Sequence, residues 1–288
     1  MTPTASAANR FPSNADLVKS LPRYSELLTE FQMAKKATGA NHDLSDLDHF
    51  VWSELGSRVK ARSLLAAKGQ AVSGWVELDE LQEIMRWKLA RGKFRPTLPS
   101  LIFSNSKDKV KFVTQRAFGV LANGNKRSRQ GEDTSLESLP ALKILSELRG
   151  VGPATASLLL SIVSPSSEGF MSDESWLCLP GLANRKLGYS EADWKRWRKE
   201  WEGRLEEWQY AHKKCENIAT SARDMEKAMW AWSHRSEDDE PKGDESKEQN
   251  LNASTTAKRK RVHAAANGDS IHAFRKARRQ SPPSLSNA

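Results

Sequence analysis

Apolar residues recur every three or four positions along most of the first 234 residues, which is the period of an amphipathic α-helix. In the segment 78–90, Leu78, Leu81, Met85 and Leu89 share one helix face. The same period predicts helices over 15–36 (in pieces), 45–65, 78–90, 107–121, 139–148, 153–163, 191–212 and 214–233. No segment alternates apolar and polar residues as a strand does, and no internal repeat occurs. The pattern therefore predicts an all-α domain over residues 15–234.

The segments outside these helices are polar. Residues 1–14 are small, polar and contain proline, and 123–134 has the composition of a surface loop. From residue 235 onward, an acidic run is followed by a stretch of Ser, Thr, Ala and Asn with basic clusters and no packable face. We expect residues 1–14 and 235–288 to be disordered.

The C-terminal tail carries two compact basic clusters. They consist of Lys258, Arg259, Lys260 and Arg261, and of Arg275, Lys276, Arg278 and Arg279. Two such clusters in a flexible tail resemble a bipartite nuclear import signal, which implies an import receptor as a partner. The alternative is a tail that binds DNA or RNA without specificity. Both interpretations predict a nuclear protein.

Tryptophans recur along one face of the predicted helix 191–212. They are Trp194, Trp197, Trp201 and Trp208. Such a stripe is typical of packing into a core, here against Met225, Met229 and Trp232 of the next helix. The cations between them belong either to a solvated face or to a DNA-facing patch: Lys195, Arg196, Arg198 and Lys199.

The charge balance indicates a polyanionic partner. The 288 residues include 45 Lys and Arg against 36 Asp and Glu, a net charge of +9 and an isoelectric point near 9.5. Two cysteines are too few for a disulfide framework or a four-cysteine iron–sulfur cluster, and no histidine spacing fits a metal site. No apolar run reaches the roughly 18 residues of a membrane helix, and the N-terminus lacks a signal-peptide core. We expect a soluble intracellular protein without a membrane segment.

A Gly-Val-Gly-Pro sequence joins the predicted helices 139–148 and 153–163. Gly150 and Gly152 can take positive φ and leave their N–H groups uncovered, and Pro153 suits the first turn of a helix. The free amides and the positive end of that helix form a site for an anion such as a phosphate. The alternative is an ordinary helix–turn–helix corner whose glycines serve only the backbone.

This sequence resembles the helix-hairpin-helix, a motif that binds the backbone of duplex DNA irrespective of sequence; here the hairpin spans 138–163. The resemblance implies phosphate contacts from the amides of Gly150, Gly152 and Thr155, with Arg149 as a further contact where the motif often has proline. It also implies a monovalent cation bridging the phosphate to backbone carbonyls. The matching carbonyls are those of Ser146, Leu148 and Val151.

The resemblance extends to the DNA glycosylase superfamily that carries this hairpin. Its members have an aspartate about twenty residues after the hairpin glycines, and Asp173 occupies that place. In the family this carboxylate stabilises the cationic sugar that forms as the glycosidic bond breaks, and it helps to position water. The alternative is a helix N-cap, a role that Ser172 or Asp173 suits. Bifunctional members carry a Schiff-base lysine where this chain has Ala154, so an enzyme of this type is expected to be a monofunctional glycosylase without lyase activity by that route.

A second candidate surface is strongly basic. Its cations are Arg86, Lys88, Arg91, Lys93 and Arg95. They are interleaved with Trp87 and Phe94, a combination that suits phosphate contacts with base stacking. The alternative is a solvated basic helix end that Gly92 terminates.

Three hypotheses follow. The chain is a nuclear duplex-DNA-binding protein that excises a base with Asp173, a non-catalytic DNA-binding module of a repair or chromatin assembly, or a helical scaffold with structural glycines. A pocket at Asp173 lined by aromatic residues favours the first, and an exposed Asp173 without room for a base favours the second. A hairpin buried under another helix favours the third.

Overall fold

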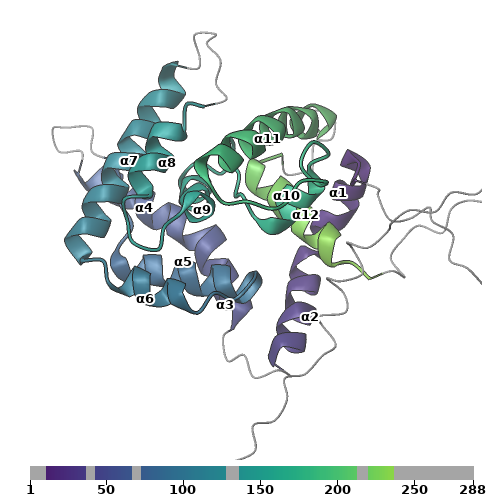
Figure 1. Ribbon diagram of the computed structural model, residues 1–288, viewed down its shortest axis with the longest axis horizontal. Helices are drawn as coiled ribbons and strands as arrows, with labels where there is room; N and C mark the ends of the chain where they lie inside the picture. The colour runs from purple at the N-terminus through teal and green to yellow at the C-terminus, as the bar shows by residue number, and fades with distance from the viewer. Residues whose placement is uncertain (1–10, 37–42, 67–72, 128–135, 213–219, 237–288) are drawn as a thin grey trace, which may run out of the picture. The chain divides into compact units, whose positions relative to one another are not determined.

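The computed structural model describes residues 11–36, 43–66, 73–127, 136–212 and 220–236, and every regular element among them is helical (Figure 1). The all-α prediction is confirmed for this part of the chain. All described residues belong to one compact unit, residues 1–240. The second unit, 241–288, contains both basic clusters and lies outside the described residues.

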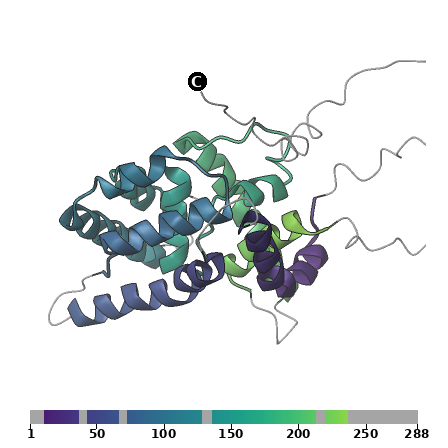
Figure 2. The same ribbon diagram turned by 90° about the horizontal axis from the view of Figure 1, so that it is seen from below.

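The N-terminal helices pack against the last described helix. They are α1 (Asn14–Ser20), the 3-10 helix η1 (Leu21–Arg23) and α2 (Tyr24–Lys36), and all three contact α12 (Ala222–His234; Figures 1 and 2). Ser13 and Asp16 form a capping box that starts α1, and the Arg204 guanidinium donates to the Pro12 carbonyl oxygen over 2.7 Å. The predicted disorder is therefore wrong for residues 11–14, which belong to the domain.

The helical run predicted over 45–65 is split in three. It comprises α3 (Leu44–His49), the π-helix η2 (Phe50–Glu54) and α4 (Leu55–Ala66).

The next elements are α5 (Leu78–Arg91), α6 (Thr97–Phe103) and α7 (Lys107–Arg127). Helix α7 ends six residues after its predicted end. The sequence pattern missed α6, which contains Pro99. This proline lies in the first turn of the helix, where it removes no internal hydrogen bond.

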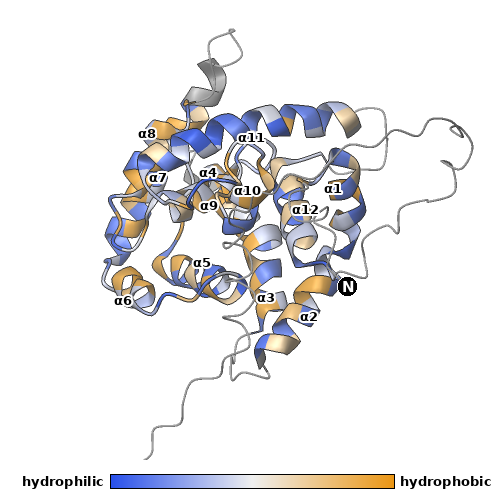
Figure 3. Cartoon of the chain, turned by 45° about the vertical axis from the view of Figure 1, so that its right-hand side comes forward, coloured by the Kyte–Doolittle hydropathy of each residue, from blue (hydrophilic) through white to orange (hydrophobic). Residues whose placement is uncertain are grey.

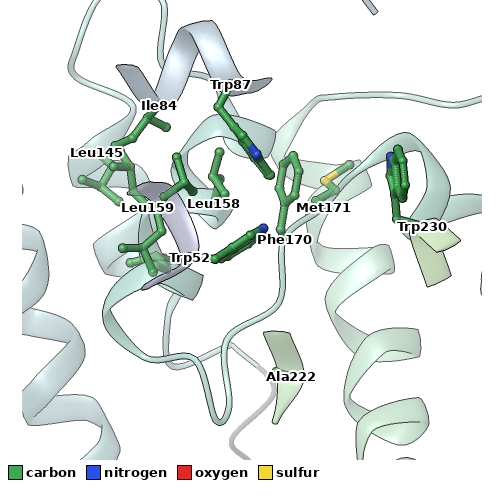
Figure 4. Close-up of a cluster of buried hydrophobic side chains, with 14 of the residues drawn as sticks. Trp52, Ile84, Trp87, Leu145, Leu158, Leu159, Phe170, Met171, Ala222 and Trp230 are labelled. Atoms are coloured by element: carbon green, nitrogen blue, oxygen red, sulfur yellow. The ribbon is translucent and has the colours of Figure 1, made fainter. Parts of the chain in front are cut away.

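Helix α9 (Pro153–Val163) lies in the core, with its residues from Ala154 to Ile162 buried. It packs against α4, α8 (Leu139–Leu145) and α11 (Glu191–His212). Helix α8 ends three residues earlier than predicted, because i to i+3 hydrogen bonds tighten the chain at Glu147 and Leu148. Beside α9, the rings of Trp52, Trp87 and Phe170 lie together (Figure 4); the centroids of Trp52 and Trp87 are 5.2 Å apart.

The tryptophan stripe of α11 is buried, as predicted. Trp194, Trp197, Trp201 and Trp208 are each at most 1 % exposed, although most of α11 is coloured hydrophilic in Figure 3. Among the cations between them, Arg198 is buried and pairs with Glu168 over 2.8 Å, so it faces neither solvent nor a ligand. The helix predicted over 214–233 begins at Ala222, after a capping box of Ser221 and Asp224. Helix α10 (Asp173–Cys178) completes the domain.

Candidate functional site

The turn between α8 and α9, residues 146–152, is hereafter the glycine turn. Gly150 has φ +81°, and a Cβ there would lie 3.1–3.2 Å from side-chain atoms of Leu101 and Ile102. The positive φ therefore favours glycine at this position, and a Cβ would also press on these side chains. Gly152 has φ −97°, so the expectation of a positive φ is wrong for this residue. A Cβ on Gly152 meets nothing within 4 Å.

Asn105, two residues after the end of α6, holds the glycine turn in place. Its side-chain oxygen accepts the Arg149 N–H over 3.0 Å, and its amide nitrogen donates to the Arg149 carbonyl over 2.9 Å. The same nitrogen donates to the Ile102 carbonyl at 3.0 Å. Sequence reasoning missed Asn105, because a single asparagine after an unrecognised helix carries no signal of a partner 44 residues away.

The start of α9, directly after the glycine turn, carries backbone N–H groups without a partner in the helix, on residues that are 5 % (Ala154) and 2 % (Thr155) exposed. The N–H groups of Ala154 and Thr155 lie in the first turn of α9, where no carbonyl of the same helix can accept them. Arg149 and Gly152 are exposed, so the turn is not buried under another helix. This geometry disfavours the scaffold hypothesis, and it matches the requirement of an anion site at a helix N-terminus.

A cavity of about 200 Å³ opens beside the glycine turn. Four segments that are distant in sequence line it: the end of α5 with the residues after it, the glycine turn with the start of α9, the start of α10 with the residues before it, and the loop before α11. Of the residues that the sequence singled out, it is lined by Lys88, Arg91, Lys93, Arg95, Gly150, Gly152, Thr155 and Asp173. The aromatic residues Trp87, Phe170 and Tyr189 also line it. We call this cavity the Asp173 pocket.

Asp173 is the first residue of α10 and is not its N-cap. Ser172 caps the helix, accepting the Ser175 N–H over 3.1 Å, so the structural role considered for Asp173 belongs to its neighbour. The Asp173 carboxylate instead accepts a hydrogen bond of 2.6 Å from the Tyr189 hydroxyl. Burial and this carboxylate raise the pKa of Tyr189 well above its usual value, so the hydroxyl stays a donor. The Arg95 guanidinium lies 4.8 Å from the centre of the Tyr189 ring.

Two further groups in the Asp173 pocket titrate close to neutrality. Burial raises the pKa of Glu174 to about 7, against the opposing effect of the Arg91 charge. Burial lowers the pKa of Lys88 to about 8, and the nearby Asp173 carboxylate acts in the opposite direction. Groups whose protonation changes near pH 7 are typical of sites that transfer protons.

Arg91 is engaged inside the protein and is not available to a phosphate. Its two terminal nitrogens each lie 2.8 Å from a carboxylate oxygen of Glu226, and the two side chains are 3 % and 1 % exposed. Glu226 also accepts the Ser172 hydroxyl over 3.0 Å. This buried pair ties α5 to α12 and to the residue that caps α10. Arg91 therefore does not offer its guanidinium for the DNA contact that the sequence predicted.

The aromatic residues of the basic segment differ from the expectation. Trp87 is fully buried and donates its indole N–H to Asp48 over 2.9 Å, so it is a core residue whose edge meets the pocket. Phe94 is 68 % exposed.

The cations of the basic segment differ in their access to the pocket. Arg86 is exposed, pairs with Glu83, and does not line the pocket. Lys93 and Arg95 are exposed and line the pocket, and Lys88 lines it while partly buried, so these three predicted cations meet at the pocket.

The carbonyls proposed to hold a monovalent cation belong to the glycine turn. The Leu148 carbonyl accepts the Val151 N–H over 3.1 Å and keeps a second lone pair. Carbonyl oxygens suit a hard cation, so the donor set of Ser146, Leu148 and Val151 fits such an ion. Within the described ranges, no group of three His, Cys, Asp or Glu side chains is arranged to hold a metal ion.

In the part of the chain that the structure describes, no helix has both the length and the apolar character needed to cross a membrane. The predicted import residues, at 258–261 and 275–279, lie outside that part.

Comparison with protein-family models, with curated proteins and with solved structures finds no match to this chain.

Proposed function

We propose that this chain is a DNA-binding protein of the helix-hairpin-helix glycosylase type, in which the glycine turn binds the phosphate backbone and the Asp173 pocket receives a nucleotide extruded from the duplex. One observation carries the proposal. Residues that sequence reasoning selected separately, from the glycine turn, from α10 and from the segment after α5, line a single cavity. An aromatic-lined pocket at Asp173 is the feature that favours base excision over simple binding.

The arrangement suits excision of a base by water. The α9 amides and the exposed cations Lys93, Arg95 and Arg149 attract phosphates, while the pocket removes the extruded nucleotide from solvent. The Asp173 carboxylate is the group that stabilises positive charge on the sugar as the glycosidic bond breaks. The volume of about 200 Å³ lies below the roughly 300–1,000 Å³ of sites for drug-sized ligands, which fits a single base or sugar.

The second candidate is a non-catalytic DNA-binding module in a repair or chromatin assembly. The hydrogen bond from Tyr189 favours it, because this bond occupies an oxygen of the carboxylate that catalysis requires. The nuclear location and the import receptor remain predictions from the two basic clusters of the tail.

Single-turnover excision on a panel of damaged and mismatched duplexes tests the proposal, with duplex binding measured in parallel. We expect Asp173→Asn to abolish excision and to leave the affinity within about threefold, since a neutral amide keeps the shape but not the charge. Salt-sensitive binding without excision by the wild type establishes the non-catalytic module. Absence of duplex binding refutes both forms of the proposal.

A further inference from the structure

A second cavity, of about 510 Å³, opens at the carboxyl end of α9, and the Asp173 pocket borders the amino end of the same helix. About 10 Å of helix separates Thr155, beside the Asp173 pocket, from Ile162, beside the second cavity. The walls come from η2, α4, the segment before α5, α7, the end of α9 and the start of α12. The volume lies within the roughly 300–1,000 Å³ of small-molecule sites, and the proposed function makes no use of this space. We call it the Arg223 cavity.

Small side chains keep the Arg223 cavity open. On α4 the lining residues recur every three or four positions and so share one helix face: Gly56, Ser57, Val59, Lys60 and Ser63. A Cβ on Gly56 would lie 2.9 Å from the Ile162 carbonyl oxygen, so α4 is in close contact with the end of α9. This face of α4 therefore gives the cavity hydroxyl groups and one cation, with little bulk.

The Arg223 cavity is positively charged. Of the described residues that line it, two are cationic, Lys60 and Arg223, and none is acidic. The Arg223 guanidinium donates to the Trp52 carbonyl oxygen, and its carbon lies 5.4 Å from the centre of the Trp52 ring. Both contacts are with uncharged groups, so the protein around the cavity does not neutralise this cation.

Arg223 lacks an acceptor as well as a counter-charge. Its Nε is buried without a hydrogen-bond partner, and within the described ranges no carboxylate forms an ion pair with it. Burial lowers the pKa of Arg223, and only Asp224, its neighbour in sequence, acts in the opposite direction. A buried donor without an acceptor and a half-buried charge without its opposite are both costly. An anion in the cavity supplies what each of them lacks.

Serine hydroxyls add hydrogen-bond donors to the cavity. Its serines are Ser53, Ser57, Ser63, Ser73 and Ser164. In the part of the chain that the structure describes, the hydroxyls of Ser53, Ser57 and Ser73 have no hydrogen-bond partner. A phosphate monoester matches this set, because it has three acceptor oxygens and a charge of about −1.5 to −2 at pH 7, close to that of two cations. A planar guanidinium binds such a group through two parallel hydrogen bonds.

We propose that the Arg223 cavity binds the phosphate monoester group of a small molecule, held by Arg223, Lys60 and the free serine hydroxyls. Apolar side chains line the rest of the cavity and contact the remainder of the molecule: Trp52, Phe118 and Leu121. The inference goes beyond the proposed function and does not depend on it, because the cavity shares no lining residue with the Asp173 pocket.

Two kinds of small molecule carry this group: a mononucleotide and a sugar phosphate. They share the monoester and differ in the aromatic base, so parallel titrations distinguish them. A DNA backbone offers a phosphodiester with a single charge, and a duplex cannot enter a cavity of about 510 Å³. The cavity therefore favours a free monoester over DNA.

The test is isothermal titration calorimetry of the full chain with inorganic phosphate, ribose 5-phosphate and adenosine 5′-monophosphate. Ribose and adenosine are the uncharged counterparts, and sodium chloride keeps the ionic strength equal. Arg223→Gln removes the guanidinium, and Lys60→Gln removes the ammonium group. The matched control is Lys109→Gln, at an exposed lysine of α7 that lines neither cavity. Thermal unfolding verifies that each variant folds. Lys60 is exposed, so Lys60→Gln keeps the test decisive if Arg223→Gln does not fold.

We expect an organic phosphate to bind the wild type and Lys109→Gln with equal affinity. Its affinity is expected to fall about tenfold or more in Arg223→Gln and about threefold or more in Lys60→Gln, because each variant loses a charged hydrogen bond. Tighter binding of the nucleotide than of ribose 5-phosphate supports the proposal with a nucleotide as ligand. The reverse order supports it with a sugar phosphate.

Four results overturn the proposal. Equal affinities for adenosine and its monophosphate show that the phosphate group contributes nothing. Absence of binding by all three phosphates leaves Arg223 and Lys60 as cations that stabilise the carboxyl end of α9. Binding that neither variant weakens places the site elsewhere. Displacement of the small phosphates by a duplex, with a lower duplex affinity in Lys60→Gln, assigns the cavity to the DNA interface.

Discussion

Tyr189 donates its phenolic hydrogen to Asp173, with 2.6 Å between the hydroxyl oxygen and Oδ1 of the carboxylate. The two residues are 16 positions apart, on the loop before α11 and at the first position of α10. Because the pKa of Tyr189 is raised, the phenol remains protonated through the physiological range and keeps the carboxylate in one orientation. Tyr189 is therefore a positioning residue in the proposed reaction. In a non-catalytic module, its hydrogen bond instead occupies the carboxylate oxygen that catalysis would need.

These two roles predict opposite results for Tyr189→Phe. The ring and its contact with Arg95 remain, and only the hydroxyl is lost. In a glycosylase, a carboxylate that is no longer fixed is expected to lower single-turnover excision by up to about 100-fold, with duplex affinity unchanged. Excision at or above the wild-type rate contradicts the positioning role. Asp173→Asn, measured beside it, gives the background rate.

The raised pKa of Glu174 makes the free energy of unfolding depend on pH. Its folded-state pKa of about 7 lies above the usual value of 4.5, so between these values the folded chain binds more protons than the unfolded chain. Stability is therefore lost as the pH rises from about 4.5 to 7. We expect Glu174→Gln to remove this loss, so that its free energy of unfolding gains about 1–3 kcal/mol relative to the wild type between pH 5 and pH 8. Urea titrations at both pH values measure this gain, and a difference that does not vary with pH contradicts it.

Gly152→Asp separates folding from DNA binding. A Cβ at this position meets nothing within 4 Å, and an aspartate at the N-cap of α9 accepts first-turn amides, which stabilises helices by about 0.5–2 kcal/mol. The same carboxylate occupies the proposed phosphate site and repels the backbone. We expect an unchanged or higher melting temperature together with at least a tenfold loss of duplex affinity. Gly152→Asn is the control, with the same shape and no charge. Equal affinities for the two variants refute a phosphate site at the glycine turn.

The sequence predicted the helices whose patterns are local. Residues 153–163 and 191–212 form α9 and α11 as expected, because strong apolar periodicity and clear ends lie within each segment. The tryptophans of α11 were interpreted correctly as core residues for the same reason. The Asp173 pocket was predicted only in its parts, since no spacing rule shows that four distant segments meet.

The features that sequence reasoning missed depend on long-range partners. Arg91 resembled its basic neighbours, and only the fold brings Glu226 to it across 135 residues. Asn105 and Tyr189 are likewise single polar residues whose partners, Arg149 and Asp173, are fixed by tertiary structure. Lys88 was identified as one cation of a basic surface, because its burial and its contact with Thr155 are properties of the packed helices.

We expect the loss of either partner of the buried pair Arg91 and Glu226 to lower the free energy of unfolding strongly. Both side chains are nearly fully buried and form two hydrogen bonds of 2.8 Å. Glu226→Gln leaves the guanidinium without its counter-charge, and we expect a loss of about 3–5 kcal/mol in the free energy of unfolding. The pair of exposed Arg196 and Asp193 is the comparison; Arg196→Gln is expected to cost about 0.5 kcal/mol or less. Similar losses for the two variants contradict a structural role for the buried pair.

We expect the charge of Arg95 to contribute to the salt dependence of duplex affinity. Its guanidinium lies over the Tyr189 ring but, unlike the buried guanidinium of Arg91, it is exposed on the rim of the Asp173 pocket, where a phosphate can reach it. Each phosphate contact releases condensed counterions, and its loss lowers the slope of log K against log salt concentration by about one. We expect Arg95→Gln to reduce the slope by about one, and Lys109→Gln, at an exposed lysine of α7, to leave it unchanged. Fluorescence anisotropy of a labelled duplex at several salt concentrations measures the slopes. If the two variants give the same slope, net charge rather than the pocket rim determines binding, and the proposed interface is wrong.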